Sequence, residues 1–180
     1  LLNQVINSNL THLDAYRRVM SAFYLNKTGN IDLVLFDSKA AYLAGTGAPA
    51  ASAGVYIPAR EAGFFFKDGG VSFGTMLHEM THQHNHKILA IRAQAWYEEG
   101  ISEYFGSGFL TKAGKKIKLG VAETSRLIKF KKTVKEKGGG SYIPLARFSQ
   151  MAKAQLTGEF YSQAWALIYF LMEVHPAGRL

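Results

Sequence analysis

The chain lacks cysteine altogether and has no long hydrophobic run among its 180 residues. Without cysteine it cannot form disulfide bonds or thiolate ligands, so any bound metal ion must be held by histidine or carboxylate side chains. No stretch of 18 apolar residues is present, and we therefore expect no transmembrane helix. No signal peptide is recognisable either. Because the chain starts at Leu1 and not at methionine, we expect it to be a piece of a longer protein. Its location stays open, with a secreted or periplasmic protein favoured.

The apolar residues, 48% of the chain, are sufficient for one domain with a hydrophobic core. We predict a single domain over residues 1–180 in the α+β class, with a small mixed or antiparallel sheet packed on a mostly helical body. Strands are expected at 31–36, 54–58 and 63–66, and helices at 2–25, 38–44, 125–137 and 159–174. Two further helices are expected to start at Val71 or Ser72 and near Trp96.

Three of these segments carry expectations about burial. Strand 31–36 is rich in branched residues and is bounded by turn signals, so we expect it to be buried. Helix 159–174 is apolar nearly all round and is expected to be buried as well. Segment 143–148 should return the chain to the core.

The motif His-Glu-x-x-His occupies positions 78 to 82. Residues four apart on an α-helix lie one turn above each other, so His78 and His82 would present two imidazoles on one helix face. Two such imidazoles can bind one metal ion. Glu79 follows the first histidine directly and is placed to hold and deprotonate a metal-bound water instead of binding the metal itself. The motif thus predicts a catalytic metal centre with Glu79 as the general base.

A catalytic zinc ion needs a third protein ligand and an open position for water. The metzincin pattern would place glycine at 85 and histidine at 88, but the chain has Asn85 and Ile88 there. A second helix-like segment instead carries Glu99 and Glu103 four residues apart on one face. The stretch between the two motifs is long enough for the first helix to end and for a second helix to return beside it.

The segments HEMTH and WYEEGISEYFG together resemble the gluzincin zinc metallopeptidases. The resemblance covers residues 71–106. The gluzincins that this region resembles include thermolysin, the zinc aminopeptidases and small bacterial minigluzincin-like domains. It implies a zincin-like fold, a bound zinc ion and hydrolysis of peptide bonds. It also implies that Glu99 is the third zinc ligand and that Glu103 hydrogen-bonds the ligand His78.

The last predicted helix begins near YSQAWALIYFL, which is similar to a tyrosine-containing segment of the zinc aminopeptidases. The similarity implies that the Tyr161 phenol stabilises the oxyanion of the tetrahedral intermediate. His175 is a second candidate for this role. Alternatively, Tyr161 only anchors a core helix through its ring.

Two predicted strands define the expected substrate-binding residues. In gluzincins the strand before the metal helix is a sheet edge, on which an extended peptide lies by β-augmentation. By this similarity either residues 54–56 or residues 62–66 would line the cleft, unless both belong to an ordinary core hairpin. The candidate residues are Gly54, Val55, Tyr56, Gly63 and Phe64. The acidic, glycine-rich motif with which aminopeptidases hold a free amino terminus is replaced by Ala-Ser-Ala-Gly at 51–54, so endopeptidase and exopeptidase activity both stay open.

Two functions of other classes also stay open. One is a catalytically inactive, zinc-containing domain that binds peptides. The other is a polyanion-binding module that uses segment 112–137, where Lys and Arg far outnumber Glu and account for most of the net charge of +8. No nucleic-acid motif accompanies this segment, so we expect a solvated helix face and no specific nucleic-acid partner.

The identity of the metal ion and the number of histidine ligands both stay open. Two histidines and a carboxylate can also hold other divalent ions, including iron. His86, four residues after His82, could lie along the ligand face, although a helix C-terminus favours histidine in any case. The oligomeric state is unknown.

Overall fold

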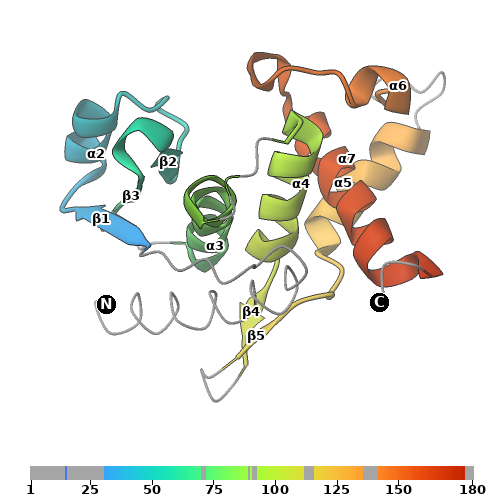
Figure 1. Ribbon diagram of the computed structural model, residues 1–180, viewed down its shortest axis with the longest axis horizontal. Coiled ribbons are helices and arrows are strands. Elements are labelled where there is room, and N and C mark those ends of the chain that lie inside the picture. The colour runs from blue at the N-terminus through green and yellow to red at the C-terminus, as the bar shows by residue number, and fades with distance from the viewer. Residues whose placement is uncertain are drawn as a thin grey trace. The chain divides into compact units, whose positions relative to one another are not determined.

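The computed structural model describes residues 31–69, 72–88, 93–111, 116–135 and 142–176, together with Ala15 and Ala90. The chain divides into two compact units: unit 1 comprises Leu1–Arg92 and Phe109–Lys118, and unit 2 comprises Ala93–Gly108 and Leu119–Leu180. The described part contains six α-helices and a small mixed sheet (Figure 1), which confirms the α+β class. Apart from Ala15, the predicted helix 2–25 lies outside the described residues. The single-domain assignment stays a prediction.

The sheet of unit 1 has three strands, β1 (Asp32–Phe36), β2 (Val55–Ile57) and β3 (Ala62–Phe66), in the order β1-β3-β2. β2 and β3 form the predicted antiparallel hairpin, and β1 runs parallel to β3. The expected burial of β1 is wrong, because β1 is an edge strand with partly exposed side chains, and Val34 is 39% exposed. The central strand β3 is the buried one, because both of its neighbours are strands.

Two helices of unit 1 pack on this sheet. Helix α2 (Lys39–Thr46) starts at Ser38, whose hydroxyl accepts a hydrogen bond from the Ala41 N–H, as an N-cap does. Helix α3 (Phe73–Gln83) starts one residue after Ser72, which caps it in the same way. Met76 and Met80 of α3 pack against Phe65 of β3. The helix with the His-Glu-x-x-His motif is therefore fixed on the sheet by its apolar face.

Two parts of unit 1 were not predicted from the sequence. α3 continues into a π-helical turn, η3 (His84–Ile88). β4 (Phe109–Leu110) and β5 (Ile117–Lys118) pair in an antiparallel ladder.

Unit 2 is helical among its described residues. Its main helices are α4 (Ala95–Gly106), α5 (Thr124–Lys135) and α7 (Gly158–Tyr169), and α4 and α5 both pack on α7 (Figure 1). The short helix α6 (Leu145–Phe148) places the Phe148 ring 4.7 Å from that of Phe160, which confirms that segment 143–148 returns to the core. After α7 the chain forms a π-helical turn, η5 (Phe170–Val174).

Apolar side chains are exposed on two segments of unit 2, and for the predicted helix 159–174 this corrects the expected burial in part. The C-terminal part of the predicted helix 159–174 reaches solvent, with Phe170 45% and Val174 56% exposed. On α5, Ile128 is 62% and Val134 50% exposed.

Among the described residues, no helix has the length and apolar character needed to cross a bilayer.

A glycine sets the packing of α4 on α7. A Cβ atom at Gly100 would lie 2.8 Å from the carbonyl oxygen of Ala164 and 2.7 Å from Ile168 Cγ1. Both residues belong to α7, and the carbonyl is part of a helix backbone that cannot move alone. Gly100 therefore permits the close approach of the two helices directly after Glu99.

We expect Gly100→Ala to destabilise the protein by about 1–3 kcal/mol, because the added methyl overlaps the α7 backbone. The measurement is the free energy of unfolding in urea. Gly158→Ala is a matched control at the start of α7: its methyl would meet only the Lys129 Nζ atom, 2.6 Å away at the end of a flexible side chain. Equal stability of Gly100→Ala and Gly158→Ala would contradict this account of the packing.

Candidate metal centre

The two histidines of the motif lie together on α3. The Nε2 atoms of His78 and His82 are 3.1 Å apart, and the rings meet edge to face at 75°. Two nitrogen ligands of a tetrahedral zinc ion lie about 3.3 Å apart, as follows from zinc–nitrogen distances of about 2.0–2.1 Å. The separation therefore fits a shared metal ion as well as a direct hydrogen bond. His82 is buried and His78 is half-buried.

Glu79 is held by the neighbouring sheet. Its Oε2 atom accepts a hydrogen bond of 2.7 Å from the backbone N–H of Tyr56 on β2. The Tyr56 hydroxyl in turn lies 2.9 Å from His86 Nδ1. Burial, with a smaller contribution from Glu61, raises the pKa of Tyr56 to about 12, so its hydroxyl keeps its proton at neutral pH. The carboxylate of the expected general base is thus oriented by an edge strand.

The other histidines near the motif have structural partners. His84 is fully buried, and its Nδ1–H donates to the carbonyl oxygen of Met80 at 2.7 Å. His86, a candidate ligand from its spacing, makes its hydrogen bond with Tyr56 instead.

The expected substrate-binding residues lie on two strands with different roles. Gly63 and Phe64 belong to β3, which pairs with β1 on one side and with β2 on the other. An added peptide strand therefore has no free edge there. Val55 is the first residue of β2 and Gly54 precedes it; in the described part of the chain β2 has no strand on its outer side. At that edge the Tyr56 N–H is already donated to Glu79, so an incoming peptide would have to compete with the carboxylate for it.

In unit 2, the expected third ligand Glu99 is buried on α4, with 2% of its surface exposed. Its Oε1 atom lies 3.0 Å from the ammonium Nζ of Lys153. By donor type, His78, His82 and Glu99 make up a candidate metal-binding triad among the described residues. A buried carboxylate paired with a cation is suited to bind a metal ion, since its charge must be balanced in any case.

Glu103 lies one turn further along α4 and is 9% exposed. Its Oε2 atom forms an ion pair of 2.5 Å with the Arg126 guanidinium on α5. The resemblance implies that Glu103 orients His78, and that role stays a prediction. The ion pair with Arg126 was not predicted from the sequence.

Tyr161 lies in the first turn of α7, half-buried, with its ring against that of Phe160. His175 is exposed.

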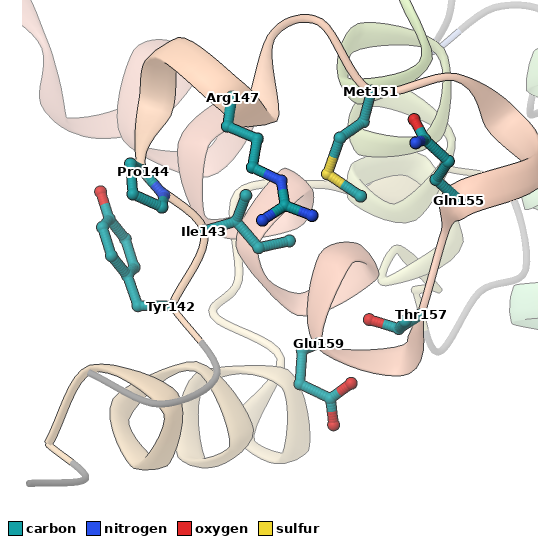
Figure 2. Close-up of a pocket in the computed structure, with 8 residues that line it drawn as sticks. All are labelled: Tyr142, Ile143, Pro144, Arg147, Met151, Gln155, Thr157 and Glu159. Atoms are coloured by element: carbon teal, nitrogen blue, oxygen red, sulfur yellow. The ribbon is translucent and has the colours of Figure 1, made fainter. Parts of the chain in front are cut away.

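Unit 2 also contains a pocket of about 400 Å³ on the segment between α5 and α7. Figure 2 shows the Arg147 side chain pointing into it, beside Ile143 and Met151. A guanidinium next to apolar side chains can bind a carboxylate that is carried on an apolar group. The pocket is lined by Tyr142, Ile143, Pro144, Arg147, Met151, Gln155, Thr157 and Glu159.

Comparison with known proteins places the chain in a family. A family model described as a protein of unknown function (DUF1570) matches residues 72–176. The chain belongs to the DUF1570 family. The matched region of this DUF1570 protein contains the His-Glu-x-x-His motif, Glu99, Glu103 and Tyr161. No curated protein matches the sequence.

We expect Arg126→Met to lower the free energy of unfolding by about 1–3 kcal/mol, because it leaves the buried Glu103 carboxylate without its cation. Urea denaturation at pH 7 measures this. Lys131→Met removes an equal charge from an exposed position on the same helix and should change stability by less than about 0.5 kcal/mol. If both variants unfold at the same urea concentration, the ion pair does not stabilise α4.

Proposed function

We propose that the chain is a zinc-dependent peptidase in which His78, His82 and Glu99 hold the metal ion. The observation that carries the proposal is the convergence of two imidazole Nε2 atoms at 3.1 Å on α3, beside a glutamate oriented by a backbone N–H. The buried carboxylate of Glu99 supplies the third donor. The proposal requires that α4 present this carboxylate to the imidazole pair.

The donor set suits zinc. Catalytic zinc sites use three protein ligands of nitrogen or oxygen type and keep a fourth position open. When bound, zinc would lower the pKa of a water molecule and polarise the substrate carbonyl. The absence of cysteine from the sequence leaves histidine and carboxylate as the donors for this ion.

The chain's own residues would move the protons. Glu79 accepts the proton of the attacking water and passes it to the leaving amine. Because the Tyr56 N–H binds Oε2, Oε1 is the oxygen that takes this proton. The Tyr161 phenol donates a hydrogen bond to the oxyanion of the peptide carbonyl. Glu103 fixes the orientation of His78 while it stays paired with Arg126.

The metal site is tested by elemental analysis of the purified chain after dialysis. We expect about one zinc ion per chain and its loss in His82→Ala, because two ligands alone do not retain the metal. Zinc should also raise the melting temperature of the wild-type chain, since it binds the folded state. Absence of zinc even after its addition would overturn the proposed site, and salt-dependent polyanion binding by segment 112–137 would then become the function to examine.

The reaction is tested with Glu79→Gln. This variant should keep its zinc but cleave a peptide library roughly 10²–10⁴ times more slowly, because the amide cannot accept the proton. Cleavage products identified by mass spectrometry would also separate endopeptidase from exopeptidase activity. A fully active Glu79→Gln variant would contradict the mechanism. Bound zinc with no cleavage by the wild-type chain would instead favour a domain that binds peptides without hydrolysing them.

A further inference from the structure

A lysine side chain reaches the buried carboxylate of Glu99 from the solvent side. Lys153 lies on a short 3₁₀ turn, η4 (Lys153–Gln155), and its Nζ atom is 3.0 Å from Glu99 Oε1. The Lys153 side chain is 73% exposed, whereas the Glu99 side chain is 2% exposed. Both residues belong to unit 2. The ion pair therefore joins a carboxylate that water hardly reaches to an ammonium group that water surrounds.

Burial of the Glu99 carboxylate makes a compensating interaction necessary. An ionised carboxylate removed from water is strongly destabilising unless a charge or hydrogen bonds compensate for the lost hydration. In the metal-free protein the Lys153 ammonium supplies that charge. A zinc ion bound to Glu99, about 2.0–2.2 Å from its ligand oxygen, would meet the ammonium at short range and repel it. The two cations are thus alternatives at the same carboxylate.

We infer that Lys153 is the resident counter-cation of Glu99 and competes with the metal ion for it. The inference rests on the proposed function, in which Glu99 is a metal ligand. Because the lysine side chain is largely exposed and flexible, its ammonium swings into water when the metal binds, and the turn that carries it need not unfold. Lys153 thereby stabilises the metal-free state and weakens metal binding, although it is not itself a ligand.

The test compares zinc affinity in full-length variants by competition with a chromophoric chelator. Lys153→Met keeps the aliphatic stem but removes the charge, and it should bind zinc about tenfold more tightly, because the metal ion no longer has to displace a cation from Glu99. Without metal the same variant should unfold at a lower urea concentration than the wild type. Lys153→Arg keeps the competing charge and should retain the wild-type affinity. Lys131→Met, the matched control on α5, should also leave it unchanged.

A zinc-loaded crystal structure gives an independent check that does not depend on the folding of any variant. There, Lys153 Nζ should lie more than about 4 Å from both Glu99 carboxylate oxygens, beyond ion-pair distance. Zinc affinity in Lys153→Met that is equal to or weaker than in the wild type would overturn the inference while the metal site stands. A lysine still in contact with Glu99 beside bound zinc would overturn it as well. Failure of every protein, wild type included, to bind zinc would overturn the metal site and this inference together.

Discussion

The packing of unit 2 depends on the compensation of two buried carboxylate charges on one helix. Glu99 and Glu103 lie one turn apart on α4, and both are largely removed from water. Each is neutralised by a cation from a different segment, Lys153 on η4 and Arg126 on α5. Between them, Gly100 lets α7 approach the same helix. Because buried charges are destabilising without compensation, the two carboxylates favour the packing of α5 and of the segment before α7 near α4.

In unit 1, three buried polar side chains near the end of α3 make hydrogen bonds to main-chain carbonyl groups. Near the end of α3, the Thr81 hydroxyl donates to the Leu77 carbonyl, and the Gln83 amide donates to the Glu61 carbonyl before β3. His84 donates to the Met80 carbonyl in the π-helical turn that follows. These bonds tie the polar end of the helix to its own backbone and to the sheet. The imidazole pair of His78 and His82 thus lies on a helix whose rotation is fixed, which metal binding requires.

Local signals in the sequence predicted most of the elements. The four-residue spacing of His78 and His82 located α3, and the same spacing of Glu99 and Glu103 located α4, because residues four apart share one helix face. A nearly continuous apolar run located α7. Burial of β1 was misjudged, since a run of branched residues does not distinguish a central strand from an edge strand. The strands β4 and β5 have two residues each, too few for any alternation. The ion pairs of Lys153 and Arg126 with the α4 glutamates could not be predicted from the sequence. Pairs between distant segments follow no regular residue spacing, and the chain has many similar cations.

The two adjacent glutamates of α4 have different surroundings, in agreement with the choice of Glu99 from the sequence. Glu98 lies in the first turn and accepts a weak hydrogen bond of 3.4 Å from the Ala93 N–H, where a negative charge is favoured by the helix dipole. Glu99, 100° further around the helix, is buried and faces a cation. Glu98 is partly exposed, so water can solvate its carboxylate and no counter-cation is needed there. A buried carboxylate whose counter-charge comes from a flexible lysine can exchange that partner for a metal ion, and this difference supports Glu99 as the ligand in the proposed site.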